Sequence, residues 1–156
     1  MIYKGKDLKW IIPYIYLTTS ENQEVFIVSP WIDVNVLLSL PWIDNNYTIT
    51  LLDLVLQYKS KRNIESHFIF SDSDTDNKLN QKSSYLLRRE GIGSKGLKNL
   101  HMKAVAGQRL LYHGSANITY SGMNLNSELV TLERISNQTL TIRNLLGDAF
   151  VGISKD

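Results

Sequence analysis

The sequence predicts an α/β fold with a mixed, largely parallel central β-sheet and helices on both of its faces. Residues 25–29 and 67–70 read VFIVS and HFIF, and such compact β-branched and aromatic runs are typical of buried strands. Between them, the apolar positions of residues 51–58 follow a helical spacing. A strand, a helix and a strand at these distances predict a right-handed βαβ unit with parallel strands.

The other elements follow from spacing and capping residues. Residues 10–17 are a short apolar run expected to pack on the domain as its first segment, and residues 34–40 fit a short helix. Residues 91–98 contain three glycines and two lysines and are expected to form a flexible loop. Three further helices are expected, with polar caps where a candidate is present. They are residues 51–62 (cap Thr48 or Thr50), 78–89, and a last helix (cap Ser136 or Asn137) to about residue 146, before a short segment near 150–153.

Size and composition indicate one domain, residues 1–156, with a core of ordinary size. The chain contains no cysteine, which excludes disulfide bonds and thiolate metal sites. Its formal charge of +2 and its pI near 8.8 are compatible with a polyanionic partner without proving one. The apolar run at residues 10–17 is too short for a membrane span and lacks a cleavage site, so we expect a cytoplasmic protein without stable membrane association.

Residues 71–80, SDSDTDNKLN, are polar and acidic. The alternation of Asp72, Asp74 and Asp76 resembles the beginning of a calcium loop, but the glycine and the closing glutamate that such a loop requires are missing. A solvated loop that leads into a helix is the favoured interpretation, and no metal site is expected.

The residues best suited to chemistry lie between positions 100 and 130. Residues 102–105 fit a strand, and if His101 and Lys103 sit on one strand, their spacing of two places an imidazole and an ammonium on the same face. A second apolar run at residues 110–112 ends in a turn, where Gly114-Ser115-Ala116-Asn117 adds a glycine and two short hydrogen-bonding side chains. A further strand begins at Glu128. Together these residues predict a phosphate site.

His101-Met102-Lys103 and Gly114-Ser115-Ala116-Asn117 resemble the HxK and GSxN elements of the phospholipase D superfamily, and Glu128 follows Asn117 at the spacing of its small single-motif nucleases. The resemblance implies a phospholipase D-like fold in which His101 attacks phosphorus and forms a covalent phosphohistidine. It also implies that Lys103, Ser115 and Asn117 bind the phosphate oxygens and that Glu128 orients His101. One position departs from the family pattern, because Gln108 stands where the motif has an aspartate.

The residues also suggest how such a site would work. A neutral imidazole is a good nucleophile near pH 7 if a carboxylate holds the proton on its other nitrogen, so neither a metal nor another cofactor is needed. The chain contains one HxK–GSxN set. Single-copy members of the family pair two chains about a twofold axis, so the resemblance predicts a homodimer in which one His101 attacks and its twin protonates the leaving group.

Basic residues precede the site in the sequence. Arg88, Arg89, Lys95 and Lys98 are possible contacts for a nucleic-acid backbone, although an ordinary solvated helix end and loop would look the same. Two other histidines, His67 and His113, are expected to be packing residues.

Three functions remain open. The favoured one is a metal-independent nuclease acting on DNA or RNA. The second is a phospholipid or small-phosphodiester hydrolase or transferase, for which Trp31, Trp42 and Ile43 would have to supply an apolar interfacial surface. The third is a non-catalytic phosphate- or nucleic-acid-binding module, which the substitution at Gln108 favours.

Overall fold

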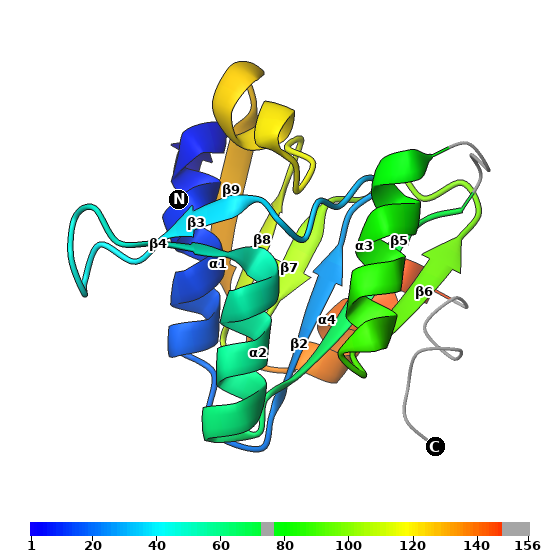
Figure 1. Cartoon of the computed structure of the whole chain (residues 1–156). Helices are drawn as coiled ribbons and strands as arrows, with labels where there is room; N and C mark the ends of the chain where they lie inside the picture. The colour runs from blue at the N-terminus through cyan, green and yellow to red at the C-terminus, as the bar shows by residue number, and fades with distance from the viewer. Residues whose placement is uncertain (73–76, 148–156) are drawn as a thin grey trace.

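The computed structural model describes residues 1–72 and 77–147, and within them seven strands form one β-sheet at the centre of the fold (Figure 1). The strand order is β1-β9-β8-β7-β2-β5-β6. The predicted strand at residues 25–29 is β2 (Glu24–Val28), which lies inside the sheet between two strands from later in the chain. β2 is therefore the strand around which the two parts of the sheet are assembled.

The sheet has a parallel part and an antiparallel part. β5 (Glu65–Ser71) runs parallel to β2 and to β6 (Gly93–Leu97). The remaining pairs are antiparallel, and they involve β7 (Ala104–Ala106), β8 (Leu110–Gly114), β9 (Leu129–Arg134) and β1 (Ile2–Lys4).

The mixed α/β class is thus confirmed, with a correction to the expectation of a largely parallel sheet. Within the described residues the parallel part comprises three of the seven strands. Residues 107–109 join β7 to β8, and so short a connection fits a hairpin but cannot make the crossover that parallel neighbours need.

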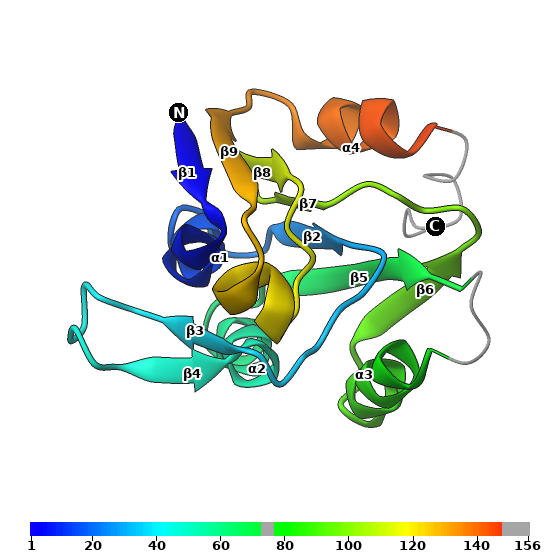
Figure 2. The same ribbon diagram turned by 90° about the horizontal axis from the view of Figure 1, so that it is seen from above.

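Helices cover both faces of the sheet, as expected (Figure 2). α1 (Leu8–Leu17), α2 (Leu51–Arg62) and α3 (Lys78–Arg89) lie on one face, which we call the α1–α3 face. α4 (Gln138–Leu146) lies on the other, the α4 face. Each face has its own apolar cluster: Tyr16, Leu54 and Leu87 belong to the first, and Ile142 belongs to the second.

The helix boundaries follow from side-chain caps. Thr50 Oγ1 accepts a hydrogen bond from Asp53 N at 3.1 Å at the start of α2. Asn137 Oδ1 accepts one from Leu140 N at 3.0 Å at the start of α4, and Asn77 caps α3 in the same way. The structure confirms the predicted helices at residues 51–62 and 78–89 and the last predicted helix. Each begins after a capping residue, because a hydrogen bond to a free backbone N–H stabilises the first turn.

Two segments differ from the prediction. Residues 34–40 do not form a helix: β3 (Leu37–Ser39) pairs antiparallel with β4 (Thr48–Thr50), and Leu38 is buried while Leu37 is exposed, which is the alternation of a strand. Residues 91–98 are not wholly a loop, because β6 forms there. Its sequence has little strand propensity, and the unpaired backbone groups at the edge of β5 supply its hydrogen-bond partners.

Parts of two expectations lie outside the described residues. These are Asp74 and Asp76 of the acidic loop, and the short terminal segment near residues 150–153. Within residues 1–72 and 77–147, no group of three or more His, Asp or Glu side chains is arranged to hold a metal ion. In the same ranges, every helix is too short or too polar to cross a bilayer.

Candidate active site

The segments singled out in the sequence meet at one end of the sheet. Ala104 at the start of β7 pairs with Val28 at the end of β2, so residues 101–103 lie just beyond the carboxyl end of β2. Gly114 at the end of β8 donates from its N–H to the Lys103 carbonyl at 3.2 Å, and β9 begins beside it. The carboxyl end of parallel strands is where open α/β sheets usually bind ligands.

His101 and Lys103 precede the strand that was expected to contain them, because β7 begins at Ala104. Lys103 Nζ donates to the His101 carbonyl oxygen at 3.1 Å, and the imidazole of His101 is exposed. In the described part of the chain, no hydrogen bond or ion pair joins His101 to Glu128. The nucleophile and its expected orienting carboxylate therefore share one end of the sheet without direct contact.

Glu128 is half-buried, and residues near the N-terminus of the chain contact it. Gly5, in the short 3₁₀ turn η1 (Gly5–Asp7), donates from its N–H to the Glu128 carbonyl at 3.2 Å. A Cβ at Gly5 would lie 2.6 Å from the Gly122 carbonyl oxygen and 3.2 Å from Glu128 Cβ, so only glycine allows this approach. Lys4 and Lys6 lie with Glu128 around a hollow of about 460 Å³ beside the π-helical turn η2 (Ser121–Leu125).

The GSxN turn is anchored by the fully buried Tyr112. Its hydroxyl donates to the Ala116 carbonyl at 2.7 Å. Burial raises the pKa of Tyr112 above its ordinary value, and the negative charge of Glu128 raises this pKa further. The Glu128 carboxylate is therefore close enough to the Tyr112 hydroxyl, which anchors the turn, for its charge to affect that hydroxyl.

Gly114 and Ser115 hold the turn against β9. A Cβ at Gly114 would overlap the Leu129 carbonyl oxygen, which explains the glycine. Ser115 N donates to the Leu129 carbonyl at 3.0 Å, and Ser115 Oγ accepts from Leu129 N at 3.0 Å. Ser115 was predicted to bind phosphate, and these contacts give it a further role, because they fix the residue that follows Glu128.

Asn117 is oriented by a residue that the sequence analysis missed, Ser29. Ser29 is fully buried; its Oγ accepts from Ile118 N at 3.3 Å and contacts two acceptors, the Trp31 carbonyl at 2.8 Å and Asn117 Oδ1 at 3.1 Å. In the described chain the amide nitrogen of Asn117 has no partner, so it remains available to an anion. A polar residue directly after the buried run VFIV was the signal that could have identified Ser29.

Gln108 lies at the other end of β7 from Lys103. The three strand residues between them, at a rise of about 3.3 Å each, keep the two residues roughly 10 Å or more apart. Gln108 Oε1 accepts a hydrogen bond from Ser20 N at 3.0 Å and so connects the β7–β8 turn to the end of α1. An amide oxygen can accept this bond as a carboxylate can, and the contact is structural.

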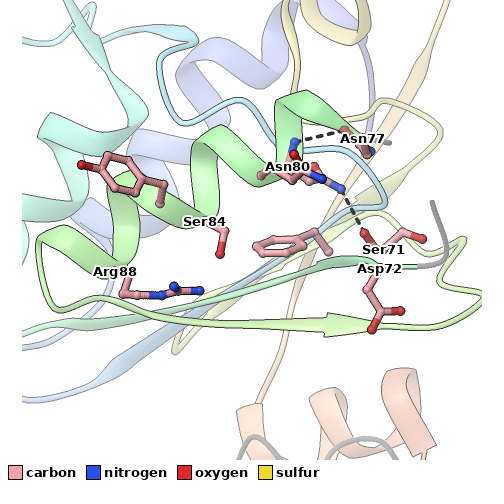
Figure 3. A pocket seen from close by; sticks show the side chains of 9 residues that line it. Ser71, Asp72, Asn77, Asn80, Ser84 and Arg88 are labelled. Atoms are coloured by element: carbon pink, nitrogen blue, oxygen red, sulfur yellow. Dashed lines mark hydrogen bonds between the residues drawn. The ribbon is translucent and has the colours of Figure 1, made fainter. Parts of the chain in front are cut away.

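The four basic residues are not brought together on one surface. Arg88 lines a hollow of about 310 Å³ between α3 and the end of β5, with Ser84 and Asp72 (Figure 3). Lys95 pairs with Ile69, which packs in the cluster of the α4 face, so Lys95 is directed to that side of the sheet. Arg89 Nε lies 3.7 Å from Glu90 Oε1, and Lys98 follows β6 in an exposed turn.

The other two histidines pair with carboxylates. His67 Nε2 lies 3.0 Å from Glu24 Oε1, and the His67 ring stacks on Phe26. His113 Nε2 lies 2.7 Å from Glu133 Oε1. Both pairs belong to the α4 face by strand register. They therefore do not contribute to the site formed by His101 and Asn117.

No protein-family model and no curated protein matches this sequence. Solved structures do resemble it. Nuc from Salmonella typhimurium, described as a phospholipase D family member, is 12% identical with a TM-score of 0.70 over 100% of this chain and 97% of that one. NucT from Helicobacter pylori is 15% identical with a TM-score of 0.63 over 98% and 95%. The archaeal chromatin protein TrmBL2, described as binding DNA, is 10% identical with a TM-score of 0.57 over 100% of this chain and 54% of its own. The chain therefore has the phospholipase D fold.

Proposed function

We propose that residues 1–156 are a single-domain phosphodiesterase of the phospholipase D superfamily that hydrolyses nucleic acid without a metal or another cofactor. The observation that carries the proposal is the convergence of the HxK segment, the GSxN turn and Glu128 at one end of the sheet in a chain with this fold. The DNA binding described for TrmBL2 supports a nucleic-acid partner for this fold.

In the proposed reaction, a ring nitrogen of His101 forms a bond to phosphorus while the bond from phosphorus to the leaving oxygen breaks. Lys103 and the amide of Asn117 offset the charge that develops on the non-bridging oxygens, with Ser115 as a further donor. Water then attacks the phosphohistidine and releases the imidazole. Glu128 sets the tautomer of His101 and stabilises its positive charge in the intermediate.

A second copy of the chain would complete this site. The leaving oxygen needs a proton, and His67 and His113 are paired with carboxylates on the α4 face. The exposure of His101 supports a homodimer in which the partner subunit's His101 acts as the general acid. The proposal requires His101 to reach Glu128 and Lys103 to leave the His101 carbonyl once substrate or the second subunit is bound, since catalytic hydrogen bonds often tighten only in the complex.

The test is a cleavage assay with labelled DNA, RNA and phospholipid in excess EDTA, combined with trapping of the phosphoenzyme. Nucleic acid should be cut, and a covalent phosphate should appear on the wild type but not on His101→Ala. His113→Ala serves as the matched control, because it removes a partly exposed imidazole that is paired with Glu133 on the α4 face. An active His101→Ala variant would refute the mechanism.

Two observations favour other functions. The missing contact between His101 and Glu128 favours a phosphate- or nucleic-acid-binding module without catalysis, which would bind DNA but cut none. The exposed side chains of Trp42 and Ile43 on the β3–β4 hairpin favour a phospholipid substrate, and binding to liposomes would reveal it. The cytoplasmic location stays a prediction.

A further inference from the structure

The loop that follows β2 is held rigidly beside Asn117. On one side, Asn80 of α3 donates to the Pro30 carbonyl at 2.8 Å and accepts from Ile32 N at 3.0 Å. Ser83 Oγ, one turn further along α3, donates to the Ile32 carbonyl at 2.8 Å. On the other side, Ser29 connects the loop to Asn117. Buried side-chain hydrogen bonds from two directions leave this backbone little freedom.

Trp31 lies in the middle of this loop and is 50% exposed. Ile32 and Ile118 form a parallel β-bridge, and both are fully buried. Ser29 Oγ donates to both the Trp31 carbonyl, at 2.8 Å, and Asn117 Oδ1, at 3.1 Å, so the backbone of Trp31 lies beside the Asn117 side chain. Within the described residues, the indole of Trp31 has no ring contact and no hydrogen bond.

The other two tryptophans differ from Trp31 in their surroundings. Trp10 has edge contacts with Tyr3 and Tyr14, and Trp42 packs on Tyr14 at a ring distance of 6.2 Å. Trp42 belongs to the β3–β4 hairpin, whose tip extends away from the sheet and from the loop after β2 (Figures 1 and 2). Trp31 is therefore the tryptophan whose flat apolar face is open next to a candidate phosphate ligand.

We propose that Trp31 stacks on an unpaired nucleobase that flanks the phosphodiester bound at Asn117, and that the chain prefers single-stranded nucleic acid. This inference rests on the proposed function. The Trp31 carbonyl and Asn117 Oδ1 share the Ser29 hydroxyl as a hydrogen-bond donor, so the two residues are close enough for one nucleotide to contact both. Only an unpaired base offers its face to an indole, because the bases of a duplex are stacked on each other.

A lipid surface fits Trp31 less well. Insertion into a bilayer needs a contiguous apolar surface. The loop that carries Trp31 is instead bordered by polar groups: Ser29 connects it to the Asn117 amide, and the carboxylate of Asp33 follows two residues after Trp31. A single aromatic face bordered by polar groups is the arrangement that binds one base beside one phosphate.

The test measures binding in a His101→Ala background, so that no substrate is cut. The probes are a labelled oligothymidylate, the same backbone with abasic sites, and the duplex. Trp31→Leu should weaken binding of the oligothymidylate about 5- to 150-fold, the range expected for one stacked base, and should leave the abasic strand and the duplex within about twofold. Trp31→Phe should recover much of the loss, and the matched control Trp42→Leu should bind like the parent.

Equal affinity of Trp31→Leu and its parent for the oligothymidylate would overturn the inference, and so would an equal loss for the abasic strand. It would also be overturned if Trp31→Leu turned a dimer into a monomer or removed vesicle binding alone, because Trp31 would then belong to a subunit or lipid interface. Cleavage by chains with native His101 is scored separately. A chain that binds through Trp31 but cuts nothing retains this inference and refutes the proposed function.

Discussion

Removal of one buried hydroxyl, in Ser29→Ala, should damage both stability and catalysis. The variant leaves the buried N–H of Ile118 without its acceptor and frees Asn117 Oδ1 and the Trp31 carbonyl from their donor. An unsatisfied buried group costs about 1–3 kcal/mol, so we expect a loss of roughly 2 kcal/mol. In a chain of this size, that lowers the melting temperature by about 4–8 °C.

The catalytic effect has a separate cause. Loss of an oriented oxyanion donor typically lowers kcat by about 10²–10³, and an Asn117 that is present but free to rotate should lower it by about tenfold. Ser66→Ala is the matched control. Ser66 is also buried, and its Oγ lies 2.6 Å from the Tyr16 hydroxyl. It lies at the start of β5, away from the end of the sheet where the candidate active site lies. Thermal melts and single-turnover kinetics measure both effects. Equal kcat in the two variants would refute the positioning of Asn117 by Ser29.

Three further predictions concern other parts of the chain. Gln108→Asp keeps an acceptor for Ser20 N, so steady-state kinetics should show kcat/KM within about twofold of the wild type. Gln108→Ala removes the acceptor, and thermal melts should show an unfolding free energy lower by about 1 kcal/mol. Burial raises the pKa values of Tyr16 and Tyr112 in the folded state, so as the pH rises the unfolded state loses these two protons first. The free energy of unfolding should therefore fall above about pH 10, by up to about 1.4 kcal/mol per pH unit for each tyrosine. Denaturant titrations of Tyr16→Phe and Tyr112→Phe should show a flatter dependence on pH. Gly114→Ala should destabilise the chain by about 1–3 kcal/mol or more and weaken phosphate binding, whereas Gly93→Ala, with only an ordinary contact, should not; equal effects in urea melts would contradict the steric argument.

Much of the fold was predictable from local signals. The helices could be located because Thr50, Asn77 and Asn137 provide caps in front of apolar periodicity. The strand directions were less visible, although the short gap between residues 102–105 and 110–112 already favoured a hairpin. β6 could not be predicted, because its glycine-rich sequence becomes a strand only beside the edge of β5.

The site was predictable where it is local in sequence and unpredictable where the topology assembles it. His101, Lys103, Ser115 and Asn117 could be named from two short motifs. Ser29 and Trp31 lie far from these motifs in the sequence and reach Asn117 only because β2 lies beside β7 and the loop after β2 forms a bridge to Ile118. A contact between His101 and Glu128 stays a prediction, since side-chain orientation in an open site depends on what occupies it.

The strand order also governs how the chain acquires its structure during synthesis. β2 obtains its second neighbour only when β7 has been made, and Ile2 of β1 pairs with Thr131 near the far end of the described chain. Such long-range pairing folds slowly and leaves apolar strand edges uncovered in incomplete chains. Nascent fragments that end before β9 should therefore aggregate or require chaperones, and the native state should appear in one late step.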